Sequence, residues 1–258
     1  MGVKTEITLQ EINEHFFCQN ILPSNDGVSD TVYFLDESYI LKVFEEKEIM
    51  SLDEEIKLLH LCCDLPVSKV VKECFLIHNK PALIYQKCKG KSVKSATQNE
   101  IESIGRFLKS FHQKTAQKRS NNRQLFTQKR LLELIEKTAY QPFFEAFFAI
   151  DIEFEDDGII HGDLFLDNAN FDNGQLSCVF DLSEACNGDF LFDLGVVALS
   201  WCEDKNDVAL LLQSYETNLT LEEFIPYIRY AGLYYSVTRY LAKRDFQPLQ
   251  KRLECILN

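Results

Sequence analysis

The sequence predicts an α+β protein of two lobes, a small β-rich N-terminal lobe and a larger, mainly helical C-terminal lobe. Short apolar and β-branched runs separated by turns fill residues 31–85, whereas apolar residues recur at helical spacing from about residue 98 onward. A short polar connector at residues 86–90 separates the two patterns and is a candidate hinge. We therefore expect one lobe over residues 1–88 and a second over residues 89–258.

The first lobe is expected to begin with a β-hairpin and to contain one helix. The hairpin is predicted over residues 31–44, where Asp36-Glu37-Ser38 can turn the chain between two apolar runs. Ser51 and Glu54 have the spacing of a capping box, and helical spacing of apolar residues follows until Pro66. Further extended runs are expected at residues 67–71, 73–77 and 82–85.

The second lobe is expected to be built mainly from helices. Phenylalanines between residues 143 and 148 predict core packing within a single long helix. Asp193 follows a turn at Gly188-Asp189 and is a natural N-cap. We expect the segment from Gly188 to Gly195 to support the loop at residues 161–168. The helical patterns cover residues 101–111, 131–150, 193–202, 207–218 and 221–244.

Composition limits the classes of partner. The net charge of −13 argues against nucleic acids and against anionic membrane surfaces. No apolar run approaches the roughly 20 residues that a membrane span needs, and the polar start of the chain does not predict a signal peptide. Nine scattered cysteines without a Cys-x-x-Cys pair predict reduced thiols in a cytoplasmic protein.

The motif that carries the chemistry is His161-Gly162-Asp163-Leu164-Phe165-Leu166-Asp167-Asn168. It places a carboxylate and a carboxamide five residues apart on a predicted loop. Asp172-Asn173-Gly174 then predicts a hairpin turn, and Asp181 follows where a strand leaves that hairpin. An ordinary aspartate-rich turn would explain any one of these residues, but it does not explain the full spacing.

These residues are the set that a kinase needs. Asp163 is the candidate general base for a hydroxyl, and its loss should cost on the order of 10²–10⁴ in rate. Asn168 and Asp181 supply oxygen ligands suited to Mg²⁺ on the phosphates of ATP. For His161 we prefer a structural role, in which its ring bonds to the backbone and holds the loop.

Lys42 is the candidate nucleotide-binding lysine. It sits in an otherwise apolar strand, where an ammonium group is costly unless it is paired. Glu55 lies on the buried side of the next predicted helix, whereas Glu54 lies opposite, so Glu55 is the expected partner. The alternative is an edge-strand lysine that points to solvent.

Weaker sequence signals indicate further contacts to the nucleotide. Gly27 and Ser29 can form a turn over phosphates, although the loop is neither a Walker motif nor Gly-x-Gly-x-x-Gly. The backbone groups of Gln86 and Cys88 can pair with adenine, provided that the two-lobe interpretation holds.

The motifs resemble, in order, those of the aminoglycoside phosphotransferase superfamily with its choline kinase and homoserine kinase relatives. The loop from His161 to Asn168 is similar to the catalytic loop of that family, and Asp181 to its second metal ligand. Gly188-Asp189 to Asp193-Leu194 resembles its Gly-Asp-Pro-x-x-Asp-Leu segment, with Phe190 in place of proline. Tyr39 to Val43 and Ile104 to His112 are also similar to segments of that family.

The resemblance implies a protein-kinase-like fold and ATP-dependent phosphorylation of a small-molecule hydroxyl. Gly162 stands where protein kinases usually have arginine, and Asp181-Leu182-Ser183 replaces their Asp-Phe-Gly triplet. Both departures favour a small-molecule kinase over a protein kinase. A nucleotide-binding pseudokinase that acts as a regulator is a further alternative.

The sequence does not decide which small molecule accepts the phosphoryl group. The candidates are an amino alcohol, homoserine, choline and an aminoglycoside-like molecule. Arg239 lies among aromatic residues in a tail loosely similar to that of homoserine-kinase-like members. Glu184, Trp201 and Tyr235 could hold a cation by charge and cation–π contact. The alternative for all four is helix packing.

Overall fold

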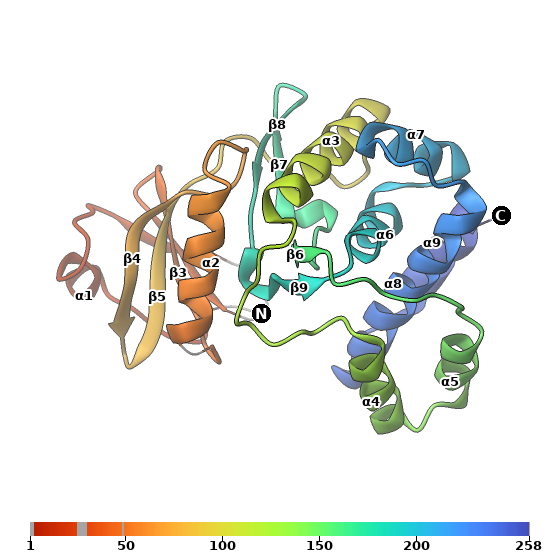
Figure 1. Cartoon of the computed structure of the whole chain (residues 1–258). Coiled ribbons are helices and arrows are strands. Elements are labelled where there is room, and N and C mark those ends of the chain that lie inside the picture. The colour runs from red at the N-terminus through yellow and green to blue at the C-terminus, as the bar shows by residue number, and fades with distance from the viewer. Residues whose placement is uncertain (1–2, 25–29, 48, 258) are drawn as a thin grey trace. The chain divides into compact units, whose positions relative to one another are not determined.

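The computed structural model describes residues 3–24, 30–47 and 49–257, and it confirms the α+β class (Figure 1). The chain forms two compact units. The first unit contains the residues up to Lys89 together with Cys178–Ser183. The second contains Gly90–Ser177 and the residues from Glu184 onward.

The first unit is built on a five-stranded antiparallel sheet with the order β1-β2-β3-β5-β4. The predicted hairpin is confirmed, since β2 and β3 pair in register from Thr31 opposite Val43 to Leu35 opposite Tyr39. Alternate residues of β2 are buried, as a strand with one face on a core requires. The strands are β1 (Ile21–Pro23), β2 (Thr31–Leu35), β3 (Tyr39–Val43), β4 (Val70–Ile77) and β5 (Lys80–Gln86).

Two helices accompany this sheet. Helix α1 (Leu9–Asn13) is short, and its residue Ile12 belongs to the same buried cluster as Leu41 of β3. Helix α2 (Ile49–Leu61) connects β3 to β4 and packs against β4; Figure 1 shows it beside the sheet. Because α2 begins at Ile49, Ser51 lies inside the helix, and the predicted capping box with Glu54 is wrong.

A later segment of the chain returns to complete the first unit. Val179, at the end of strand β8 (Gln175–Val179), forms a parallel bridge with Val67. The Val179 amide donates to the Pro66 carbonyl at 2.7 Å, and the Ser68 amide donates to the Val179 carbonyl at 2.9 Å. These bonds attach the residues before Asp181 to the same unit as Lys42.

A disulfide joins Cys88 to Cys178 in the first unit, with their Cα atoms 5.8 Å apart. The expectation of nine reduced cysteines is therefore wrong for this pair, while the other seven cysteines stand outside this disulfide. The pair is separated by 90 residues, so no local spacing pattern of the kind that predicts a disulfide framework or a zinc site was present.

The second unit is mainly helical, as expected (Figure 1). Helices α6 and α8 pack closely against each other, and α3 packs against α7. Apolar residues of α3 from Ile101 to Phe111 are buried at helical spacing. The helices are α3 (Gln98–Thr115), α4 (Gln128–Thr138), α5 (Gln141–Phe148), α6 (Phe190–Trp201), α7 (Lys205–Tyr215), α8 (Leu221–Leu241) and α9 (Gln247–Leu257).

The single helix predicted over residues 131–150 is wrong, because the structure has two helices there. Ala139 adopts a left-handed conformation with φ of 50° and ends α4. Pro142 then occupies the first turn of α5, where its missing amide does no harm. Core packing is confirmed for Phe143, which is buried, but Phe148 is 74% exposed.

Short strands frame the loop that carries the chemical motif. Strand β6 (Gly158–Ile160) pairs antiparallel with β9 (Cys186–Gly188). Strands β7 (Ala169–Asp172) and β8 form the predicted hairpin around Asn173-Gly174. The motif therefore begins as β6 ends and finishes as β7 begins.

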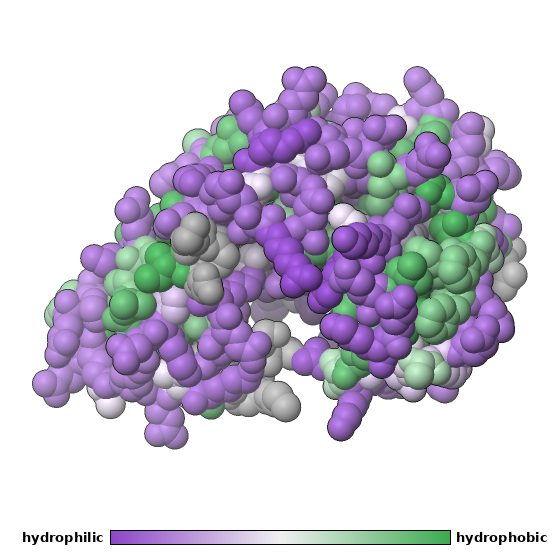
Figure 2. All heavy atoms as spheres, turned by 60° about the horizontal axis from the view of Figure 1, so that its bottom comes forward, coloured by the Kyte–Doolittle hydropathy of each residue, from purple (hydrophilic) through white to green (hydrophobic). Residues whose placement is uncertain are grey.

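The molecular face in Figure 2 is largely hydrophilic, with a few hydrophobic patches. This surface agrees with a chain in which 26% of residues are charged. Within residues 3–24, 30–47 and 49–257, no helix is long and apolar enough to cross a membrane.

Candidate functional site

The catalytic loop, defined here as residues 161–168, is held in place by its own backbone and by buried side chains. The Phe165 amide donates to the Asp163 carbonyl at 2.8 Å, and the Asn168 amide donates to the Phe165 carbonyl at 2.9 Å. The second bond belongs to a turn of 3₁₀ helix at Leu166–Asn168. The loop is therefore a sequence of tight turns with a defined shape.

Asp193 anchors the start of the catalytic loop. Its fully buried carboxylate accepts the backbone amides of His161 and Gly162, each at 2.8 Å. The buttressing role expected for this segment is thus present, but the predicted N-cap is wrong. Asp189 caps α6 instead, because its carboxylate accepts the amides of Leu191 and Phe192.

His112 supports the same carboxylate from helix α3. Its Nε2 lies 3.0 Å from Asp193 Oδ2, its Nδ1 lies 2.7 Å from the Tyr215 hydroxyl, and its ring stacks on Phe190 at 4.0 Å. Burial alone would raise the pKa of Asp193, but the hydrogen bond and charge of His112 lower it overall. The carboxylate is consequently ionised and able to accept several donors.

Gly162 is required by the geometry of the loop. Its φ of +79° is left-handed, and a Cβ built there would lie 2.2 Å from Cε2 of Phe126. A side chain at this position would thus be strained and would collide with a buried ring. The positive φ and the contact with Phe126 explain physically why this chain has glycine at a position where protein kinases usually have arginine.

Asp163 and Asn168 come together, as the motif predicts. The Asn168 Nδ2 group donates to the Asp163 carbonyl at 2.7 Å and lies 3.2 Å from Asp163 Oδ2. His161 is fully buried, and its Nδ1 accepts the Asp163 amide at 3.3 Å, which is the structural role that we expected. Asp163 itself is partly exposed, so its carboxylate can meet a ligand.

Two residues predicted as substrate contacts hold the catalytic loop. Trp201 is fully buried, and its Nε1 donates to the Leu164 carbonyl at 3.0 Å. The hydroxyl of Tyr235 donates to the Gly162 carbonyl. Buried Ser200, next to Trp201 in α6, accepts the Leu166 amide at 2.9 Å.

In the first unit, Lys42 lies at the centre of a cluster of charges. Its Nζ is 2.7 Å from Asp181 Oδ1 and 3.4 Å from Asp30 Oδ2, and its side chain is only 14% exposed. Strand β3 lies between β2 and β5 in the sheet, so the edge-strand alternative is wrong. Burial alone would lower the pKa of Lys42, but the charges of Asp181, Glu55 and Asp30 raise it overall.

Asp181 sits in a strained backbone conformation, with φ of 63°. A non-glycine residue in the left-handed region is uncommon and is often found at functional sites. Its Oδ1 accepts the Ser183 hydroxyl at 2.8 Å, and Lys47 Nζ donates to the Ser183 carbonyl. Burial raises the pKa of Asp181, but Lys42, Ser183 and Lys47 lower it overall, so this carboxylate is ionised.

Glu55 is buried in the first unit, at 3% exposure, and its Oε1 accepts the Tyr85 hydroxyl at 2.7 Å. Among the described residues, its Oε2 has no hydrogen-bond partner. Burial raises the pKa of Glu55, although the nearby charge of Lys42 opposes that shift. Glu55 therefore acts on Lys42 through its charge, and the hydrogen-bonded acid partner of Lys42 in the structure is Asp181.

The remaining predicted residues are less well connected to these groups. The Gln86 amide donates to the Lys69 carbonyl at 2.8 Å, and Cys88 forms the disulfide described above. Gly27 and Ser29 lie outside the described residues. Glu184 is exposed in the second unit, and Arg239 is partly exposed in the last turn of α8.

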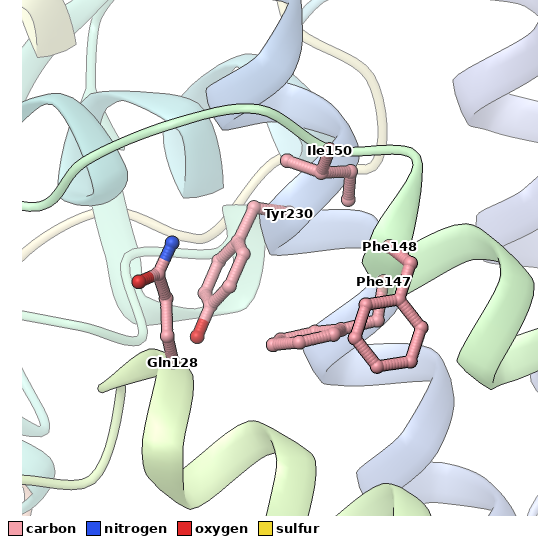
Figure 3. A pocket seen from close by; sticks show the side chains of 5 residues that line it. All are labelled: Gln128, Phe147, Phe148, Ile150 and Tyr230. Atoms are coloured by element: carbon pink, nitrogen blue, oxygen red, sulfur yellow. The ribbon is translucent and has the colours of Figure 1, made fainter.

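Two hollows in the second unit have none of the predicted site residues among their lining residues. The first has a volume of about 180 Å³ and is lined by side chains of α4, α5 and α8 and by Ile150 (Figure 3). Its lining residues are Gln128, Phe147, Phe148, Ile150 and Tyr230. The second measures about 330 Å³ and includes Phe126 and Asp189.

Sequence reasoning missed Asp30, Tyr85, Ser200 and the role of His112. Asp30, just before β2, contacts Lys42 of β3, and Tyr85 of β5 contacts Glu55 of α2. Spacing along the chain does not report such pairs. His112 gave a weak signal, because a histidine ends the apolar face of a predicted helix.

Comparisons with known sequences agree with this geometry. A homoserine kinase from Polaromonas naphthalenivorans is 28% identical over 253 residues, covering 84% of this chain and 79% of that protein. A homoserine kinase from Methylobacillus glycogenes is 26% identical over 246 residues, with coverage of 83% and 77%.

Solved structures share the fold at low sequence identity. The GDP and kanamycin complex of APH(2")-IIia has a TM-score of 0.71 at 15% identity and covers 95% of each chain. Choline kinase LicA from Streptococcus pneumoniae has a TM-score of 0.71 at 17% identity, covering 95% of this chain and 96% of that one. These similarities confirm the predicted two-lobed, protein-kinase-like fold class.

The family assignment rests on the sequence itself. Residues 20–225 match the model of the phosphotransferase enzyme family, APH, which spans both the Lys42 cluster and the catalytic loop. The match covers well over half of the chain. The chain therefore belongs to the phosphotransferase enzyme family and is a small-molecule kinase.

Proposed function

We propose that the protein uses ATP and Mg²⁺ to phosphorylate the hydroxyl of a small amino alcohol, with homoserine as the first acceptor to test. The observation that carries this proposal is the partly exposed Asp163 carboxylate, fixed beside the Asn168 amide in a loop anchored by Asp193. Homoserine is the first choice because the sequence relatives described above are homoserine kinases.

Asp163 would act as the base. The acceptor oxygen attacks the γ-phosphorus of ATP and forms the new P–O bond, while the bond between that phosphorus and the β,γ-bridging oxygen breaks and ADP leaves. The proton of the acceptor hydroxyl passes to Asp163. Phosphoryl transfer depends mainly on positioning and charge neutralisation, so Asp163 does not need an unusual pKa for this role.

Lys42 would bind the phosphates of the nucleotide. In the structure, its ammonium group is neutralised by Asp181 and Asp30. A phosphate oxygen offers the same charge and acceptor chemistry as these carboxylates, so ATP can take over part of the pairing. Backbone groups at Gln86 and Cys88, and the turn at Gly27 and Ser29, remain proposed nucleotide contacts.

The donor set fits Mg²⁺. Asp181 is ionised, and the Nδ2 of Asn168 is used in bonds to Asp163, which leaves the amide oxygen as the ligating atom. Magnesium usually takes one or two protein side chains together with water and substrate phosphates. When bound, the ion would neutralise charge on the transferred phosphoryl group.

The test is ATP turnover by the full chain with a panel of acceptors, in the presence and absence of Mg²⁺. The panel contains homoserine, choline, other amino alcohols, an aminoglycoside and a peptide mixture, with GTP compared to ATP. We expect turnover with one small acceptor and a loss of roughly 10²–10⁴ in kcat for Asp163→Asn. Binding of ATP without turnover above Asp163→Asn would favour the pseudokinase alternative, and transfer to peptides alone would favour a protein kinase.

A further inference from the structure

Asp30 differs from the other acids around Lys42 in having no place among the proposed metal ligands or nucleotide contacts. Its Oδ2 lies 3.4 Å from Lys42 Nζ, and its side chain is only 13% exposed. Asp30 directly precedes β2, in which Val32 pairs with Lys42. Diagonal neighbours in a hairpin are within reach of a long side chain, so the register of β2 and β3 brings Asp30 to the lysine.

A second bond holds the Asp30 carboxylate beside Lys42. Its Oδ1 accepts the backbone amide of Glu45 at 3.2 Å. Glu45 is itself fixed, because its carboxylate accepts the hydroxyls of Thr5 and Thr31. The amide that holds Asp30 therefore belongs to an anchored residue, and we expect the Asp30 carboxylate to stay next to Lys42 when a ligand enters.

The two acids that contact Lys42 have different prospects when a nucleotide binds. Asp181 Oδ1 lies closer, at 2.7 Å from Lys42 Nζ. In the proposed reaction this carboxylate binds Mg²⁺, so its charge is neutralised by the metal. Asp30 has no such second cation in the proposed reaction. Its negative charge stays at the point where a phosphate oxygen has to meet the ammonium group.

We propose that Asp30 competes with the nucleotide phosphates for Lys42 and thereby weakens the affinity of the protein for ATP. The proposal rests on the proposed role of Lys42 as the phosphate-binding residue. A phosphate oxygen that pairs with Lys42 must displace the Asp30 carboxylate or lie beside it, and like charges at such a distance repel. Asp30 is therefore a specificity-determining residue, whose effect depends on the negative charge that the ligand carries.

The variant Asp30→Asn removes the charge and keeps the shape of the side chain. Its amide oxygen can still accept the Glu45 amide. We expect the Kd of ATP to fall on the order of tenfold, while the Kd of adenosine, which has no phosphate, stays unchanged. The measurement is calorimetric titration of the full chain with Mg²⁺ and without an acceptor. It reports the number of binding sites separately from Kd, so a partly folded variant lowers that number and leaves Kd intact.

The matched control is Asp36→Asn, at the other end of β2. The Oδ1 of Asp36 accepts the amides of Gln19 and Asn20 at 3.0 and 2.8 Å. This variant changes the net charge by the same amount and keeps an acceptor for the same backbone groups. We expect its Kd for ATP to match that of the unmodified protein. An equal gain in both variants would overturn the inference, because net charge alone would then explain the effect.

Two further outcomes count against competition by Asp30. The inference is overturned if Asp30→Asn binds ATP with unchanged or weaker affinity while Lys42→Met loses affinity. It is also overturned if adenosine gains as much affinity as ATP, because the effect would then not involve phosphate. Unchanged ATP affinity in Lys42→Met, or no binding of ATP by the unmodified chain, would overturn the proposed function and the inference with it.

Discussion

The catalytic loop and the Lys42 cluster are stabilised by different kinds of contact. In the loop, backbone amides and carbonyls bond to side chains of α6 and α8, most of them buried. Around Lys42, side chains pair with one another as opposite charges, through Asp30 and Asp181. We therefore expect the loop to keep its shape when a ligand binds, whereas Lys42 can exchange a carboxylate partner for a phosphate.

The largest effect should come from removing the anchor of the loop. Asp193→Ala leaves the amides of His161 and Gly162 and the ring of His112 without their buried acceptor. Breaking a buried pair in this way typically costs about 3–5 kcal/mol. We expect that loss in the free energy of unfolding, measured by urea denaturation, together with loss of turnover.

Asp189→Ala is the control for this variant. Asp189 is also a buried aspartate at the start of α6, but its side chain caps the helix and also accepts the Glu155 amide, and none of its hydrogen bonds reaches the catalytic loop. Loss of a cap costs about 1 kcal/mol, and turnover per folded molecule should be retained. Equal losses of turnover in the two variants would show that contact with the loop is not what Asp193 contributes.

An intermediate effect is expected from crowding the loop. In Gly162→Ala the new methyl group meets the Phe126 ring, and the backbone is held at positive φ. The left-handed conformation costs about 1–2 kcal/mol, and overpacking adds about 1–3 kcal/mol. A thermal melt and the measured kcat should both decrease.

Gly174→Ala separates these two costs. Gly174 has nearly the same φ, +77°, but nothing lies within 4 Å of the position that a Cβ would take. This variant should lose only the conformational part, and its kcat should stay near that of the unmodified protein. If both variants lose the same stability, the contact with Phe126 is not important.

The smallest effect concerns the cluster in the first unit. Tyr85→Phe removes the donor to Glu55, whose other oxygen already lacks a partner among the described residues. We expect a loss of about 1–2 kcal/mol in the free energy of unfolding. Burial raises the pKa of Glu55, so its carboxyl group binds a proton more tightly in the folded state than in the unfolded state. Losing the Tyr85 donor raises that pKa further.

The sign of the pH dependence follows from that shift. A carboxyl group with a raised pKa contributes stability at low pH that is lost as pH rises from its ordinary value of 4.5 through the folded value. The deficit of Tyr85→Phe should therefore grow as pH rises through the folded pKa of Glu55, which lies above 4.5. Urea denaturation over a pH series measures it, and a deficit that shrinks with rising pH would contradict the assignment.

The local parts of the structure were predictable from sequence, and the long-range parts were not. The hairpin of β2 and β3 and the proximity of Asp163 to Asn168 follow from alternation and from spacing within a few residues. Lys42 and Asp181 are separated by 139 residues, and no local pattern reports their pairing.

Two of the wrong predictions, the single long helix and the N-cap of α6, could have been avoided from the sequence. Pro142 marked the break between α4 and α5, because a proline belongs at the start of a helix and not in its interior. Asp189 preceded a run of apolar residues and was as good a capping residue as Asp193. The disulfide between Cys88 and Cys178 had no such signal, since the sequence around each cysteine is unremarkable in spacing.

The return of Cys178–Ser183 to the first unit means that no single cut of the chain separates the two units. A fragment ending at Lys89 would lack the disulfide partner of Cys88, the strand that pairs with Val67 and the acid that neutralises Lys42. Recombination that exchanges the small unit between relatives must therefore transfer two separate stretches of the gene. A crossover near Lys89 alone would combine a lysine from one parent with an aspartate from the other.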